Sequence, residues 1–110
     1  SNPASFELEV SRGMILFHDL AKMTAAESAF LAARRKYLAA HAAWQAAPPE
    51  TRGEEPERLL YARTLSHLAR IRESAGDTRA AIDYYQEAQE YTKTPDIIRR
   101  HLHELEHDDG

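Results

Sequence analysis

Apolar residues recur every three or four positions along most of the chain, which is the spacing of amphipathic helices rather than of strands. Proline, glycine and short polar stretches separate five such segments. The pattern predicts an all-α fold of about five helices, in which the third and fourth form a tight antiparallel hairpin.

The first predicted helix covers about residues 5–22, and its apolar face carries Phe6, Val10, Met14, Phe17, Leu20 and Ala21. Leu8 and Ile15 fall on the opposite side, seven residues apart, and we expect them to be exposed in an isolated hairpin. A second interpretation stays open, because residues 6–10 also alternate like a strand that turns at Arg12-Gly13. Residues 6–17 are therefore either helix or hairpin.

The second predicted helix begins at Thr24-Ala25-Ala26-Glu27, which has the spacing of a capping box. Pro48-Pro49 is expected to end it, because the residue before a proline avoids helical backbone angles. Residues 48–55 are polar and predict a loop between two helical hairpins. The inward face of this helix carries Phe30, Ala33, Tyr37, Ala40 and Trp44.

Three further helices follow the predicted loop. Pro56 suits the first turn of the third helix, and Gly76 suits the position just after its end. Asp77 is expected to cap the fourth helix, and Thr94-Pro95-Asp96 to begin the fifth. Their inward residues are predicted to be Leu60, Leu65, Leu68, Ala69 and Ile71, then Ala81, Ile82, Tyr85 and Ala88, then Ile98, Leu102 and Leu105.

The segment from Arg63 to Tyr91 resembles a tetratricopeptide repeat. The residues that carry the resemblance are Leu65, Leu68-Ala69, Gly76-Asp77, Ala81, Tyr85 and Ala88. The segment departs from the family pattern at Arg72, where an aromatic residue is usual, and at Pro95, which comes late. A looser second match comprises Ala33, Tyr37 and Ala40, closed by Pro48. The resemblance implies one tetratricopeptide-like domain over residues 1–110, built of antiparallel helical hairpins with the fifth helix as a C-terminal cap. Separately, the opening Ser1-Asn2 would suit a tag remnant, so we expect residues 1–4 to be either a tag or disordered.

The resemblance also implies a function, namely a non-catalytic scaffold that binds a peptide or helix of a partner protein in a concave groove. The family's groove positions carried onto this repeat are Arg63, Ser66, Arg70 and Glu73, with His67 beside them. Arg63 and Arg70 share a helix face and would suit an acidic partner segment. The family's carboxylate-clamp combination of lysine and asparagine is not present.

A different function stays open, in which the chain is a self-associating structural module. Leu8 and Ile15 would leave apolar surface that a second copy could cover, giving a homodimer. The chain would also suit a piece of a larger protein.

His103-Glu104-Leu105-Glu106-His107 matches the H-E-x-x-H pattern of zinc metallopeptidases. Histidines at this spacing share a helix face, and the glutamate between them could activate a zinc-bound water. Three residues follow the motif, so no downstream segment of this sequence returns with a third ligand. Catalysis is therefore only a remote alternative, and we expect no catalytic residue, no metal and no cofactor.

Composition narrows the remaining classes of function. The formal net charge of −4 argues against a nucleic-acid partner, which usually requires a basic surface. No apolar run approaches the roughly 20 residues that a membrane span needs. The chain contains no cysteine, which excludes disulfides and thiolate chemistry and suits the cytoplasm.

Overall fold

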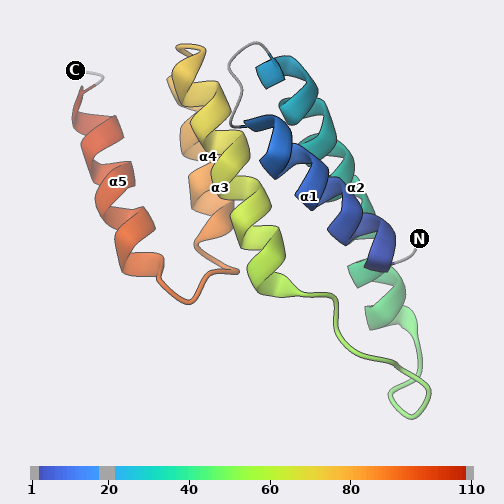
Figure 1. Ribbon diagram of the computed structural model, residues 1–110. Coiled ribbons are helices and arrows are strands. Elements are labelled where there is room, and N and C mark those ends of the chain that lie inside the picture. Colours follow the sequence, from blue (N-terminus) through green and yellow to red (C-terminus); the bar gives the residue numbers. More distant parts are fainter. Residues whose placement is uncertain (1–2, 18–21, 109–110) are drawn as a thin grey trace. The chain divides into compact units, whose positions relative to one another are not determined.

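The computed structural model describes residues 3–17 and 22–108, with only the backbone described for residues 3–5, 17, 107 and 108. Over these residues the chain forms five α-helices and no strand (Figure 1). The helices are α1 (Pro3–Phe17), α2 (Met23–Ala46), α3 (Arg58–Ser74), α4 (Thr78–Ala88) and α5 (Pro95–Asp108). The predicted all-α fold is confirmed over this part of the chain. None of the helices so described is long and apolar enough to cross a membrane.

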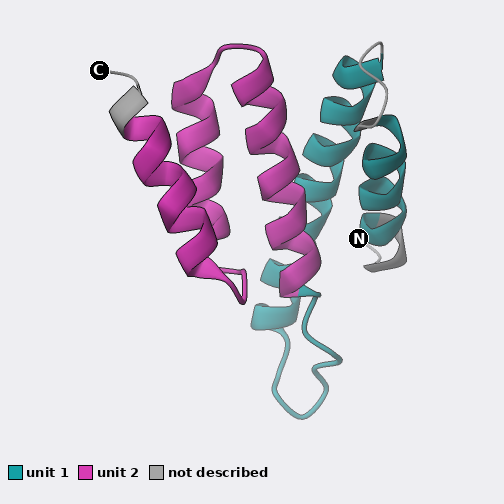
Figure 2. Ribbon diagram, turned by 60° about the vertical axis from the view of Figure 1, so that its left-hand side comes forward, with its two compact units in different colours: residues 1–57 teal, residues 58–110 magenta. Residues whose placement is uncertain are grey.

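The chain divides into two compact units, residues 1–57 and 58–110, coloured separately in Figure 2. The first unit holds the hairpin of α1 and α2, and the second holds α3, α4 and α5. The boundary lies two residues after the end of the loop predicted at residues 48–55. A single domain over residues 1–110 stays a prediction.

The first unit is an antiparallel helical hairpin with a tight helix–helix contact. Phe6 and Val10 of α1 are buried, and the Phe6 ring lies 5.5 Å from that of Tyr37 on α2. Gly13 packs so closely on α2 that a Cβ atom there would lie 2.8 Å from the fully buried Phe30 ring. Residues 6–17 are helical, so the strand interpretation is wrong, and the predicted turn glycine is instead a helix-packing residue. The inward positions predicted at Leu20 and Ala21 lie outside the described residues.

The start of α2 differs from the predicted capping box. The helix begins at Met23, and the residue in front of it, Lys22, makes no side-chain cap bond. Thr24 is already the second helical residue, whereas a cap must act from a non-helical residue in front of the first turn. The prediction at Thr24 is therefore wrong, although the predicted end before Pro48 is confirmed.

The segment after α2 folds back on the end of that helix. The Arg52 guanidinium donates to the backbone carbonyls of Gln45 and Ala47, each at 3.0 Å, and lies 4.5 Å from the centre of the Trp44 ring. The Trp44 indole N–H donates to the Gly53 carbonyl at 2.8 Å. We call these four contacts the Arg52 clasp. Its two guanidinium hydrogen bonds satisfy carbonyls at the end of α2, where helical partners run out.

A tight turn joins α3 and α4 in the second unit. Gly76 adopts a φ of +82°, its N–H donates to the Glu73 carbonyl, and the Asp77 N–H donates to the Arg72 carbonyl. This is the double hydrogen bond of a Schellman turn, for which glycine is preferred. The Asp77 carboxylate then accepts from the Ala80 N–H at 3.2 Å and caps α4. Both predictions at this turn are confirmed.

The interior of the α3–α4 hairpin holds the residues that carried the family resemblance. Ala69, Ala81 and Ala88 are fully buried and allow the two helices to approach closely. Leu65 and Leu68 are also fully buried, and Tyr85 is nearly so. At the open end, the Tyr61 hydroxyl donates to the Glu87 carboxylate at 2.6 Å. The hairpin is therefore fixed at both ends.

The start of α3 lies later than predicted. Its first residue is Arg58, so Pro56 precedes the helix instead of occupying its first turn. A proline breaks no helical hydrogen bond at either position, so its presence does not determine the first helical residue.

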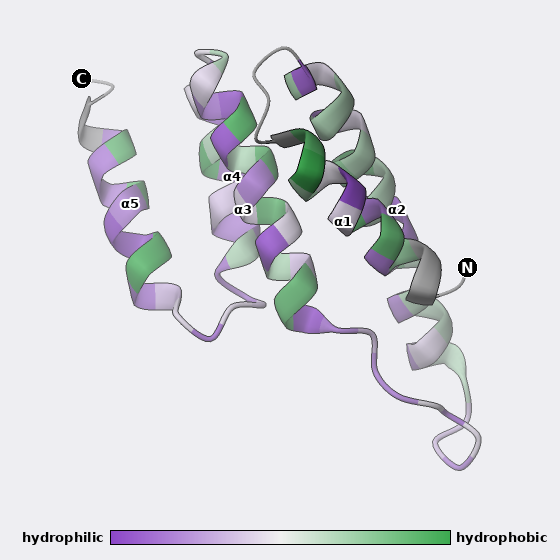
Figure 3. Cartoon of the chain, viewed as in Figure 1, coloured by the Kyte–Doolittle hydropathy of each residue, from purple (hydrophilic) through white to green (hydrophobic). Residues whose placement is uncertain are grey.

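The fifth helix begins at Pro95, as predicted, and packs on α4 through the buried side chains of Ile98 and Leu102. Most of its remaining surface is hydrophilic (Figure 3). This arrangement brings one side of α5 toward α3 across the end of α4, which creates the site described next.

Candidate functional site

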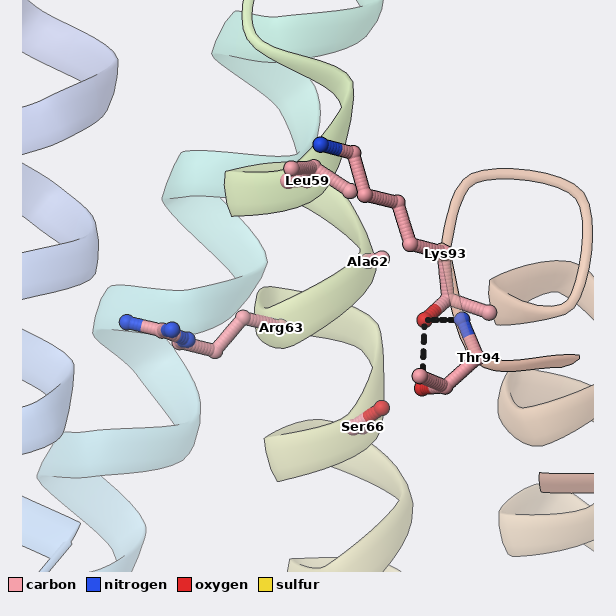
Figure 4. A pocket seen from close by; sticks show the side chains of 7 residues that line it. Leu59, Ala62, Arg63, Ser66, Lys93 and Thr94 are labelled. Atoms are coloured by element: carbon pink, nitrogen blue, oxygen red, sulfur yellow. Dashed lines mark hydrogen bonds between the residues drawn. The ribbon is translucent and has the colours of Figure 1, made fainter. Parts of the chain in front are cut away.

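Two adjoining pockets lie along α3 in the second unit, and Ser66 lines both of them. The first has a volume of about 330 Å³ and is lined by Leu59, Ala62, Arg63, Ser66, Thr92, Lys93 and Thr94 (Figure 4). The second has a volume of about 430 Å³ and is lined by Ser66, Arg70, Tyr85, Ile97, Ile98 and His101. We call the two together the α3–α5 groove.

The charged side chains of the α3–α5 groove are cationic. Arg63, Arg70 and Lys93 line it, and no aspartate or glutamate is among the lining residues. Arg63 and Arg70 are two helical turns apart, which separates their backbones by about 10 Å along α3. In Figure 4 the Arg63 side chain extends away from Thr94, whereas Lys93 extends toward Leu59. Arg63 therefore lines the first pocket with its guanidinium directed outward, whereas Lys93 lies on the Leu59 side of the same pocket.

These cations are not engaged by neighbouring carboxylates. In the described part of the chain, no ion pair joins Arg63, Arg70 or Lys93 to an acidic side chain. By contrast, Arg99 contacts Asp96 at 2.8 Å elsewhere in the same unit. The groove thus offers cationic groups to a ligand without first breaking an internal ion pair.

A hydrogen-bonded cluster fixes one end of the groove. The Tyr85 hydroxyl donates to Glu73 Oε1 at 3.1 Å, and His101 Nε2 lies 3.0 Å from the same oxygen. The His101 ring also meets the Tyr85 ring edge-on, with 5.0 Å between centroids. Burial raises the pKa of Tyr85 above its ordinary value, and the Glu73 carboxylate raises it further. Because the three residues belong to α3, α4 and α5, the cluster holds the groove walls together.

The structure brings together only some of the residues predicted for the groove. Ser66 lines both pockets, Arg63 the first and Arg70 the second. Glu73 lies at the end, in the cluster with Tyr85 and His101, so it supports the groove instead of lining it. His67 lines neither pocket: it follows Ser66, so it lies about 100° further round the helix, and its Nδ1 is 2.8 Å from the Arg63 carbonyl.

Sequence reasoning missed the second wall of the groove. Ile97, Ile98 and His101 come from α5, and Lys93 and Thr94 from the turn before it. One signal was available, because Ile97 is apolar and yet falls outside the inward pattern of Ile98 and Leu102. The proximity of His101 to Glu73 joins positions far apart in sequence and has no local signal.

Of the H-E-x-x-H residues whose side chains the structure describes, none lines the groove. His103 is exposed and lines a separate polar pocket of about 260 Å³ with Gln86, Gln89, Arg99, Leu102 and Glu106. The side chain of His107 lies outside the described residues. Among the side chains that are described, no group of three or more histidine and acidic residues could hold a metal ion.

Comparison with protein-family models, curated proteins and solved structures found no match to this chain.

Proposed function

We propose that the chain is a non-catalytic scaffold of the tetratricopeptide type that binds an acidic peptide segment of a partner protein in the α3–α5 groove. One observation carries the proposal: three cations and no acidic residue line this groove in a chain whose net charge is −4. A carboxylate ligand would gain charge-assisted hydrogen bonds there without displacing any acidic partner among the described residues.

The packing of the second unit supports the choice of repeat type. The small and large residues of the resemblance are buried between α3 and α4, and Gly76 forms the turn. In such repeats the first helix of each pair lines the concave surface, and here α3 lines both pockets. The proposal retains the cytoplasmic location expected from the sequence.

The proposal is tested by selecting ligands from a displayed library of random peptides on the immobilised full chain. We expect the selected peptides to be enriched in aspartate and glutamate. The double variant Arg63→Glu, Arg70→Glu should lower the affinity of the selected peptides by about tenfold to a hundredfold, since a charge-assisted hydrogen bond contributes about 1.5–3 kcal/mol.

The matched control is Arg35→Glu, Arg79→Glu, which makes the same change in net charge at two exposed arginines outside the groove. It should leave the selected peptides bound. If the groove variant and the control retained the peptides equally, the proposal would be wrong.

A second function, self-association, is favoured by a separate observation. Leu8 and Ile15 on α1 are 69% and 74% exposed, and an open apolar surface of this kind marks a site where a partner can bind. Sedimentation at a low and a high protein concentration tests this function. A concentration-dependent dimer that Leu8→Gln, Ile15→Gln abolishes would support it, and a monomer at both concentrations would exclude it.

A further inference from the structure

The exposed apolar side chains of the second unit gather at the α3–α5 groove. Over its described residues, the large hydrophobic side chains left exposed are Leu59, at 41%, and Ile97, at 63%. Leu59 lines the first pocket and Ile97 lines the second. The groove therefore combines the unit's open apolar positions with cations that pair with none of the described carboxylates.

Each pocket pairs an apolar side chain with a cation. In the first pocket, Figure 4 shows Lys93 extending toward Leu59. In the second, Ile97 and Ile98 lie on α5 opposite Arg70 on α3, and the Tyr85 ring lines the same pocket. A segment of aspartates alone would pair with the cations but leave the apolar surface exposed to water. An apolar segment alone would cover that surface and leave the cations without carboxylates.

We infer that the groove recognises a segment in which acidic residues alternate closely with large aliphatic residues. This inference rests on the proposed function and specifies its ligand. The carboxylates bind at Arg63, Lys93 and Arg70, and an aliphatic side chain occupies the pocket between Ile97, Ile98 and Tyr85. The roughly 10 Å between Arg63 and Arg70 corresponds to about three residues of extended peptide, so the acidic and aliphatic residues fall within one short stretch.

The expected contribution of the aliphatic residue is large enough to measure. Burying a leucine-sized side chain is worth about 1.5–3 kcal/mol, which corresponds to about tenfold to a hundredfold in affinity. Because Ile97 is the more exposed of the two apolar positions, it has the most surface to lose on binding and should carry much of this effect.

The test uses three pools of synthetic peptides, equal in length and randomised in order, on the full chain. One pool contains Asp and Leu with Gly, the second replaces Leu by Ser, and the third replaces Asp by Lys. The apparent affinity of each pool is measured for the unchanged chain and for Ile97→Gln. The matched control is Ile15→Gln, the same substitution at an isoleucine of similar exposure on α1.

We expect the Asp/Leu pool to bind most tightly, by at least about tenfold over the Asp/Ser pool. Ile97→Gln should remove most of that preference, and Ile15→Gln should preserve it. Equal binding of the Asp/Leu and Asp/Ser pools would overturn the inference and leave the acidic-peptide function standing. If the Lys/Leu pool bound as well as the Asp/Leu pool, the proposed function would fail as well.

Discussion

Gly13 shows how one residue determines the spacing of two helices. Glycine is the least favourable ordinary residue in a helix interior, and alanine in its place usually stabilises a helix by up to about 1 kcal/mol. Here the space that a methyl group needs is occupied by the Phe30 ring, which would lie 2.8 Å from the added carbon. Phe30 is fully buried, so its ring could move only by displacing neighbouring core atoms.

We predict that Gly13→Ala destabilises the protein by about 1–3 kcal/mol, the usual cost of overpacking a core, in spite of the gain in helix propensity. The measurement is urea denaturation followed by circular dichroism. Gly53→Ala is the control, since no atom beyond the adjoining residues lies within 4 Å of the added methyl group, and it should change stability little. A stabilised Gly13→Ala variant would show that α1 and α2 do not approach so closely.

Tyr85 gives a second prediction at this scale, concerning alkaline pH. Its pKa is raised by burial and by Glu73, so the folded state retains the phenol proton at pH values where the unfolded chain, with a pKa near 10.0, loses it. The unfolded state then binds fewer protons, and stability falls as pH rises above about 10. Below that pH the contribution is fully present.

Tyr85→Phe should reduce the loss of folding stability at alkaline pH. The measurement is the urea midpoint at several pH values from neutral to alkaline. Tyr84→Phe, at the neighbouring position, is the control and should keep the slope of the unchanged protein. If both variants lost stability with pH as steeply as the unchanged protein, burial of Tyr85 would not be the cause.

At the scale of single residues, prediction from sequence succeeded where the signal is local. Gly76 and Asp77 were identified because a Schellman turn and an N-cap depend on adjacent residues. Gly13 was not identified as a packing residue, because its role depends on Phe30, a residue on another helix. Thr24 was misplaced, because the same capping pattern occurs inside first turns as well as in front of them.

At the scale of elements, the segment after α2 behaves as part of that helix and not as a free connection. The Arg52 clasp ties residues 52 and 53 to the last turn of α2 through two carbonyl bonds, one ring contact and the indole bond. A guanidinium at a helix C-terminus also interacts favourably with the helix dipole.

We predict that Arg52→Ala releases this segment and speeds its cleavage by a glutamate-specific protease several-fold, because Glu50, Glu54 and Glu55 are exposed beside the clasp. Arg35→Ala, an exposed arginine in the middle of α2, is the control and should not change the rate. Unchanged cleavage in Arg52→Ala would show that the clasp does not restrain the loop.

The five elements themselves were predicted from apolar periodicity, which reports the face that each helix buries. What periodicity cannot report is which faces meet. The groove wall formed by Ile97 and His101 depends on the packing of α5 on α4, which periodicity does not predict. Ser66 and Arg70 share one face of α3 by helical spacing and therefore share a pocket, whereas His67 lies about 100° further round the helix and does not line it.

At the scale of the whole molecule, the groove and the rest of the chain have opposite effects on an acidic ligand. The net charge of −4 repels it weakly at long range, whereas Arg63, Arg70 and Lys93 attract it at contact distance. Salt screens exposed charges over roughly 8–10 Å at physiological ionic strength. The attraction at contact should nevertheless dominate the salt dependence, because it is the stronger of the two.

We therefore predict that the affinity for the Asp/Leu peptide pool falls several-fold from low to physiological salt, as measured by titration at constant pH. The Arg63→Glu, Arg70→Glu variant should show a weak salt dependence or one of opposite sign. If the affinity of the unchanged protein did not depend on salt concentration, recognition would rest on the apolar side chains alone.

The placement of the aromatic residues has a consequence for cooperativity. The only tryptophan, Trp44, belongs to the first unit, whereas four of the five tyrosines, all except Tyr37, belong to the second. Tryptophan emission therefore follows the unfolding of residues 1–57, and tyrosine absorbance follows mainly that of residues 58–110. Coincident transitions in the two signals would mean that the units melt as one thermodynamic body, and separate midpoints would give each unit a free energy of its own. The intrinsic tryptophan and tyrosine signals therefore show, without an added label, whether the chain unfolds as one unit or as two.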